Sequence, residues 1–111
     1  MWNCWKATSI DQTPELDLAA WKIYEVSSPY WEGRTRHFSG YNLTEMEGRA
    51  SNVIVEFDKD KLVGKTKSGR VYKLINVLIG LVKEADADYV WAFYVARNQL
   101  FDIVDVTSEY K

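Results

Sequence analysis

Basic and aromatic side chains in the middle of the chain are the residues whose chemistry could recognise a partner. Arg34 and Arg36 are two positions apart on a predicted strand and therefore share one face. Guanidinium and ammonium groups bind carboxylates and phosphates, and an aromatic ring beside them can stack on a ligand. We predict a partner-binding face made of six residues, namely Arg34, Arg36, Tyr41, Lys65, Lys67 and Arg70.

The hairpin predicted near Ser68-Gly69 adds a second argument for an anionic neighbour. A two-residue turn there would place Lys67 opposite Arg70, and like charges directly opposite each other on paired strands repel. Three neighbours could offset that repulsion: the chain's own acidic ends, an acidic protein partner, or the phosphates of a nucleic acid. Alternatively, Tyr72 simply faces the core while Lys73 protects an edge strand.

The charge distribution keeps these three possibilities open. The chain carries a net charge of −2, but residues 1–33 hold two basic and five acidic side chains, residues 34–73 nine and five, and residues 74–111 three and six. A basic middle therefore lies between two acidic ends. The interpretation that the ends neutralise the middle is slightly favoured, because blocks of charge are usually solvated faces.

Catalytic and metal-binding patterns are weak in this sequence. His37 is the only histidine and Cys4 the only cysteine, so a zinc site built from several thiolates is excluded. Cys4 and His37 could form a nucleophile–base pair, but the tryptophans beside Cys4 favour an inert thiol. Val63 to Thr66 is similar to the end of a phosphate-binding loop, yet Lys59 stands where that motif needs glycine. We predict a protein that is not an enzyme and holds no metal and no cofactor.

Length and cysteine content set the class of protein. The 111 residues suit a single domain over residues 1–111. A lone thiol and the lack of a secretory signal predict a cytoplasmic protein. The longest nearly apolar run, Leu74 to Val82, is far shorter than the roughly 20 residues that span a bilayer, so no membrane partner is expected.

Short segments rich in β-branched and aromatic residues predict most of the secondary structure. The expected strands cover residues 19–27, 34–43, 52–58, 62–67, 70–75 and 101–107, and residues 2–9 could form a further strand before them. The four from residue 34 to residue 75 have short polar links and predict an antiparallel meander. Alternation in the second of them places Val53, Val55 and Phe57 toward the core.

Residues 86–99 are ambiguous between a helix and a strand. The helix would be capped by Asp86 and would carry two apolar stripes, one with Val90 and Tyr94 and another with Tyr89 and Phe93. The alternative is a buried strand over residues 89–96. Length and capping favour the helix. We therefore predict an α+β fold, in which one helix covers a face of a five- or six-stranded, mostly antiparallel sheet.

The run from Leu74 to Val82 has three possible fates. It could form a buried strand, a packed loop, or an apolar patch for a partner, since Asn76 is its single polar residue. Burial in the core is favoured.

Several short motifs together carry a resemblance to a group of proteins. They are Gly33-Arg34-Thr35-Arg36-His37-Phe38, Glu47-Gly48-Arg49, Phe57-Asp58, Ser68-Gly69-Arg70-Val71-Tyr72 and Asp86-Ala87-Asp88-Tyr89-Val90-Trp91. Over roughly residues 31–107 the chain resembles small uncharacterised bacterial proteins carried on plasmids or prophages. It departs from them at Leu74 to Val82, where they have a polar, glycine-rich loop. The resemblance implies no activity or site, but it favours an accessory or inhibitor protein.

Two functions are therefore expected from the sequence. The first is a small non-enzymatic protein-binding module, encoded by a mobile element, that regulates or inhibits an unidentified protein partner through the charged face. The alternative is a nucleic-acid-binding protein that uses the same basic and aromatic residues. The protein itself is expected to be a monomer or a weak homodimer.

Overall fold

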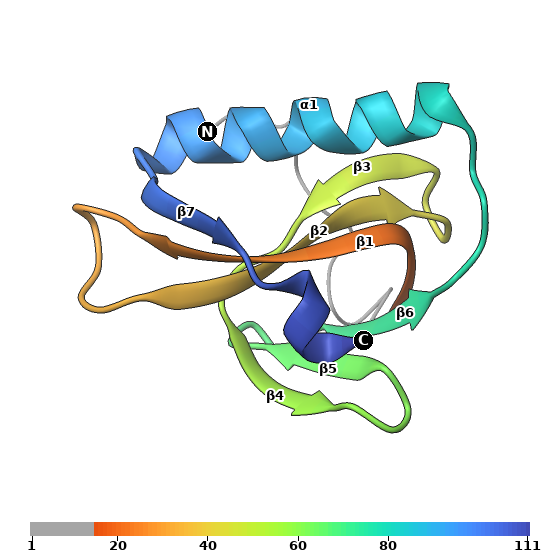
Figure 1. Ribbon diagram of the computed structural model, residues 1–111, viewed down its shortest axis with the longest axis horizontal. Coiled ribbons are helices and arrows are strands. Elements are labelled where there is room, and N and C mark those ends of the chain that lie inside the picture. Colours follow the sequence, from red (N-terminus) through yellow and green to blue (C-terminus); the bar gives the residue numbers. More distant parts are fainter. Residues whose placement is uncertain (1–14) are drawn as a thin grey trace.

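The computed structural model describes residues 15–111, and within them it forms an α+β structure (Figure 1). The strand predicted at residues 2–9 and Cys4 lie outside the described residues. The elements are β1 (Glu15–Ser27), β2 (Thr35–Asn42), β3 (Glu47–Ala50), β4 (Ile54–Asp58), β5 (Val63–Thr66), β6 (Val71–Ile75), α1 (Leu81–Asn98), β7 (Phe101–Asp105) and the 3₁₀ helix η1 (Thr107–Tyr110).

The long strand β1 organises the sheet, whose order is β3-β2-β1-β6-β5-β4, with β7 also paired to β1. The first part of β1 pairs with β6 in parallel, and its last part pairs with β7 in antiparallel. Between these parts, Ala20 has a φ of 48° and the register with β2 shifts. Such an irregularity bends a strand, which lets β1 change neighbours along its length. The predicted α+β class and mostly antiparallel sheet are confirmed.

The predicted four-strand meander is wrong at its first link. β4, β5 and β6 are joined as antiparallel neighbours, but β2 pairs with β1 and β3 instead of β4. β3 lies inside the segment that was expected to be a polar link. Its sequence, Glu47-Gly48-Arg49-Ala50, has neither apolar alternation nor β-branched residues, so the sequence contains no strand signal there.

Buried apolar residues form two clusters within residues 15–111. The smaller one, of Val26, Trp91 and Leu100, joins β1 to α1. The larger one consists of Leu16, Leu18, Trp21, Ile23, Phe38, Tyr72, Leu74 and Val106. Ile54 and Phe57 of β4 pack against it, whereas Val55 is 54% exposed. The predicted inward set of Val53, Val55 and Phe57 is therefore wrong at Val55. A register shift between Ile54 and Glu56 breaks the simple alternation on which that prediction relied.

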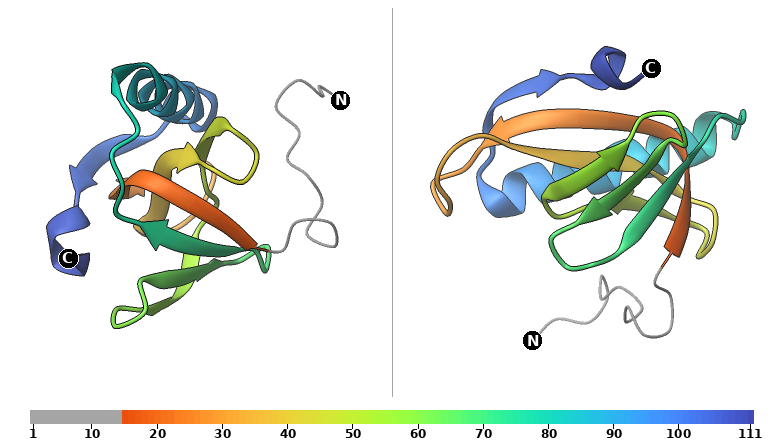
Figure 2. Two further views of the ribbon diagram at one scale, coloured as in Figure 1. Left: turned by 90° about the vertical axis from the view of Figure 1, so that its right-hand side faces the viewer. Right: turned by 90° about the horizontal axis from the view of Figure 1, so that it is seen from below.

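The helix packs against β3 and β2 and closes the other side of the sheet (Figures 1 and 2). Trp91 of α1 stacks on Tyr24 of β1, with ring centroids 4.5 Å apart. The predicted helix is confirmed, but it starts at Leu81 after Gly80, so Asp86 is not its cap. Asp86 instead accepts a 3.0 Å hydrogen bond from the Gly48 N–H and ties the helix to β3.

The apolar run from Leu74 to Val82 leaves the core after its first residues. Leu74 is buried in β6, but Leu78, Leu81 and Val82 are 100%, 83% and 85% exposed. Burial of the whole run is therefore a wrong prediction. The run crosses the end of β6, a connection and the first turn of α1, and these later parts extend beyond the sheet (Figure 1). Within residues 15–111 no helix has the length and apolar character needed to cross a membrane.

Candidate functional site

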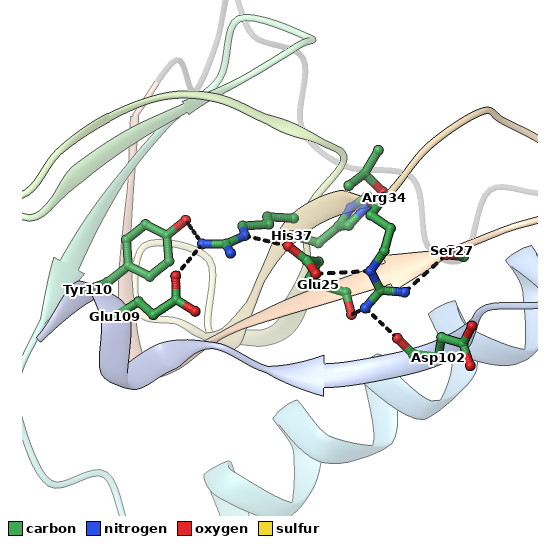
Figure 3. Close-up of polar contacts among 9 residues, drawn as sticks. Glu25, Ser27, Arg34, His37, Asp102, Glu109 and Tyr110 are labelled. Atoms are coloured by element: carbon green, nitrogen blue, oxygen red, sulfur yellow. Dashed lines mark hydrogen bonds and ion pairs between the residues drawn. The ribbon is translucent and has the colours of Figure 1, made fainter.

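Arg34 and Arg36 meet at one carboxylate at the end of the β1–β2 hairpin (Figure 3). Arg34 Nε donates to Glu25 Oε2 at 2.9 Å, and Arg36 Nε donates to Glu25 Oε1 at 3.0 Å. The strand register places Glu25 directly opposite Arg36. The hydrogen bonds from Arg34 and Arg36 hold the pKa of Glu25 below its ordinary value, because they favour the charged carboxylate.

Arg34 also fastens β7 to the hairpin. Its Nη2 donates to the main-chain carbonyl of Asp102 at 2.7 Å, and its Nη1 donates to Ser27 Oγ at 3.0 Å (Figure 3). The Arg34 guanidinium therefore links β2, which follows it in the chain, to β1 and β7 through charge-assisted hydrogen bonds, in addition to neutralising Glu25.

Arg36 is held from the other side by the C-terminal 3₁₀ helix. Its Nη1 donates to Glu109 Oε1 at 3.0 Å and to the Tyr110 hydroxyl at 2.7 Å, and its guanidinium lies 5.6 Å from the centre of the Tyr110 ring. The hydrogen bond with Tyr110 raises the pKa of Arg36 above its already high value. Glu25 and Glu109 come from the two acidic ends of the sequence. For these two arginines, the expected anionic neighbour is the chain itself.

The other predicted partner-binding residues have different surroundings. Lys65 on β5 lies 3.8 Å from Glu56, and Lys67 is exposed in the turn. Arg70 is 5% exposed, and Tyr41 is 6% exposed on β2, where the Lys83 ammonium lies 5.5 Å from its ring centre. Tyr41 therefore offers little ring surface for stacking.

The repulsion predicted between Lys67 and Arg70 does not occur across the turn. The Thr66 N–H donates to the Arg70 carbonyl at 3.0 Å, so the turn has three residues instead of two. Gly69, with a φ of 95°, adopts the conformation that such a turn requires. Lys67 stands in the turn while Arg70 is buried.

His37 is a buried structural link between strands. It is 2% exposed, its Nδ1 donates to the Ser51 carbonyl at 2.9 Å, and its Nε2 accepts from the Thr35 hydroxyl at 2.7 Å. A neutral imidazole satisfies both contacts. Burial lowers the pKa of His37, and burial also raises the pKa of neighbouring Tyr94 to about 12. Among residues 15–111, no three His, Cys, Asp or Glu side chains gather as metal ligands would.

The solvent side of α1 carries a second apolar stripe, which we call the outer α1 face. It consists of Leu81, Val82, Ala85, Tyr89, Ala92, Phe93 and Ala96, all exposed. At 3.6 residues per turn, these seven positions fall within an arc of about 120° that holds no charged residue. The opposite stripe, with Ala87 and Trp91, is buried against the sheet. The sequence predicted the stripe with Tyr89 and Phe93, but not that it faces solvent.

No protein-family model, curated protein or solved structure shows significant similarity to the chain. The expected likeness to small proteins of plasmids and prophages therefore stays a prediction. The candidate sites depend on the geometry of this chain alone.

Sequence reasoning missed two parts of these sites. Glu109 and Tyr110 lie beyond the last predicted strand, and Asp86 was interpreted as a helix cap instead of a link to Gly48. One signal pointed to the contact of Glu109 with the basic middle: the opposite net charges of the segments, which favoured pairing between the ends and the middle. Nothing in the sequence pattern pointed to the hydrogen bond between Asp86 and Gly48.

Proposed function

We propose that this protein is a non-enzymatic protein-binding module that docks its partner on the outer α1 face. The observation that carries the proposal is that α1 is apolar on both sides while the sheet covers only one. Tyr89 is 62% exposed and Phe93 is 40% exposed. Both lie on the same stripe of the helix as Leu81 and Val82, which are 83% and 85% exposed. Contiguous exposed apolar surface of this kind is typical of interaction sites in soluble proteins.

The shape of the face favours a helix as the docking element. Residues 82, 85, 89, 92 and 96 repeat at alternating spacings of three and four, which is the pattern of a helix–helix seam. Three of these positions are alanines, and small side chains let a second helix approach closely. Over residues 81–96 the seam is about 22 Å long, enough for roughly four turns of a partner helix.

Charge at the edge of the face narrows the chemistry of the partner. Glu84 and Asp88 are exposed and flank the stripe on one side. A partner helix with apolar residues on one face and lysines or arginines beside them would complement this edge. The proposed partner is therefore a separate protein that presents a basic, amphipathic helix.

The nucleic-acid alternative has weaker support. Arg34 and Arg36 are already bound to Glu25 and Glu109, so a phosphate backbone would have to displace these carboxylates. A regulatory or inhibitory role on a mobile element is consistent with a binding module, and it remains part of the proposal.

Site-specific crosslinking in cells that naturally produce the protein tests the proposal. A photoreactive phenylalanine analogue is placed at Tyr89, and at Tyr30 as the matched control, because both side chains are 62% exposed. We expect a crosslinked partner protein from position 89 only, and its loss when Ala92→Glu is added. Equal crosslinking at both positions, no crosslink at 89, or a crosslink only between two copies of this chain would contradict the proposal.

A further inference from the structure

A cleft between β3, the β5–β6 turn and α1 is lined by an unusual set of charges. Its volume is about 480 Å³, within the range of small-molecule sites. Among the residues that the structure describes, three arginines and one carboxylate line it: Arg49, Arg70, Arg97 and Glu47. Arginines therefore outnumber carboxylates in this lining, although the chain as a whole carries a net charge of −2.

Two of the arginines come from the interior of the fold. Arg49 on β3 is 9% exposed and Arg70, just before β6, is 5% exposed. Arg49 Nε lies 3.4 Å from the Tyr72 hydroxyl, and Arg49 Nη1 lies 3.3 Å from Glu47 Oε2. Buried guanidinium groups need hydrogen-bonding partners, because leaving water is costly for a charge.

The charges in the cleft act on one another. Burial, and then the positive charge of Arg49, lower the pKa of Arg70, while Glu45 and Glu47 act in the opposite direction. Two cations held close together in a partly water-excluded site attract an anion more strongly than they would in bulk water. Glu47 provides one negative charge, but its side chain is half-exposed, so it can swing aside.

The remaining walls of the cleft combine polar residues, namely Asn52, Ser68 and Asn98, with an aromatic and apolar part. Tyr72 and Tyr94 contribute rings, and Val90 contributes an aliphatic side chain. Tyr94 is fixed in place because its hydroxyl lies 3.4 Å from His37 Nδ1 and its ring stacks on Trp91. Such a wall suits a flat apolar body beside the charged group of a ligand.

We propose that this cleft binds a small organic anion, namely a carboxylate or phosphate attached to an aromatic body. The anionic group would lie between Arg49 and Arg70 and displace Glu47 from Arg49, with the apolar body against Tyr72 and Tyr94. The site is separate from the outer α1 face, with Phe93 alone bordering both. Failure of one proposal therefore leaves the other standing.

Calorimetric and NMR titration of the full chain tests this site with four probes. Phenyl phosphate and benzoate carry the two anionic groups on a ring, inorganic phosphate has no ring, and benzyl alcohol has no charge. We expect saturable binding of at least one of the two aromatic anions, at least tenfold weaker binding of inorganic phosphate, and no binding of benzyl alcohol. Comparison of phenyl phosphate with benzoate identifies the preferred anion.

Four variants locate the binding. Arg70→Gln should weaken it about tenfold, since it removes a charge-assisted contact. Arg97→Gln should weaken it by a smaller factor, since it removes a positive charge from the wall of the cleft. Glu47→Gln should strengthen it several-fold, because it removes the competing carboxylate. Lys61→Gln, at an exposed position outside the cleft, should leave it unchanged. If Arg70→Gln does not fold, the Arg97→Gln and Glu47→Gln variants still show whether the anion binds in this cleft.

Three results would overturn the proposal. They are the absence of saturable binding by either aromatic anion, equal binding of benzyl alcohol, and affinities that Glu47→Gln and Arg97→Gln leave unchanged.

Discussion

At the scale of single residues, His37 shows how a chemically versatile side chain is used for structure. Its two ring nitrogens bind the Thr35 hydroxyl and the Ser51 carbonyl inside the protein, so both polar atoms are satisfied in the neutral form. A buried histidine is more often a satisfied core residue than a base. These contacts give His37 a structural role inside the protein.

The lowered pKa of His37 predicts a pH dependence of stability. Above the ordinary value of 6.5, both the folded and the unfolded states hold a neutral His37. As the pH falls below 6.5, the unfolded state binds a proton that the folded state does not, so the free energy of unfolding decreases until the pH reaches the folded-state pKa.

Urea unfolding at pH 7.5 and pH 5.5 measures this effect. Because His37 is the only histidine, His37→Gln should remove most of the difference between the two pH values. The same substitution should also cost about 1–3 kcal/mol at pH 7.5, because it disturbs buried hydrogen bonds. A pH difference that is equally large in the variant would assign the effect to other groups.

At the scale of elements, the contact between α1 and β3 depends on the absence of a side chain. A Cβ at Gly48 would lie 2.6 Å from the main-chain oxygen of Asp86 and 2.8 Å from Val90 Cγ2. Real Cβ atoms do not approach a backbone oxygen this closely, so the helix can rest on β3 only if residue 48 is glycine.

Gly48→Ala is therefore expected to lower the free energy of unfolding by about 1–3 kcal/mol, because the helix must move away from the sheet. Asp86→Asn is the control, since it keeps an oxygen that can accept the Gly48 N–H and should cost less. Chemical denaturation followed by circular dichroism compares the two variants. A milder effect of Gly48→Ala than of Asp86→Asn would contradict the steric explanation.

The place where the apolar run leaves the core can be tested with two leucines four positions apart. Leu74 is 5% exposed and Leu78 is 100% exposed. Leu74→Ala should cost about 2–5 kcal/mol through a lost core contact, whereas Leu78→Ala should change stability by less than about 0.5 kcal/mol. Thermal unfolding of both variants checks this, and similar losses would mean that Leu78 is covered.

At the scale of the whole molecule, one carboxylate from each of the two acidic segments lies against the basic middle. Glu25 and Glu109 both reach the Arg34–Arg36 pair, although they are far apart in the sequence. The protein therefore presents less free positive charge around Arg34 and Arg36 than the sequence predicts. Any anionic partner would have to compete with the two carboxylates for these arginines.

Removing both carboxylates should expose that charge. The double variant Glu25→Gln/Glu109→Gln is expected to elute from a heparin column at higher salt than the wild-type protein, because Arg34 and Arg36 become available to sulfate groups. Glu56→Gln with Glu15→Gln is a matched control with the same change in net charge at other ion pairs. An equal shift in both double variants would show that only net charge matters.

The sequence by itself determined the fold class and most strand positions and favoured the helix over a strand, because these follow from local residue types and from periods of two and 3.6 residues. It also indicated that opposite charges would meet. The tertiary structure alone decided the rest: β3 as a strand, the neighbours of β2, the burial of Arg70 and the exposure of Tyr89. These depend on which segments meet in space. A short polar strand such as Glu47–Ala50 forms because β2 and α1 lie beside it, and an apolar stripe is exposed only because the sheet already covers the other side of the helix.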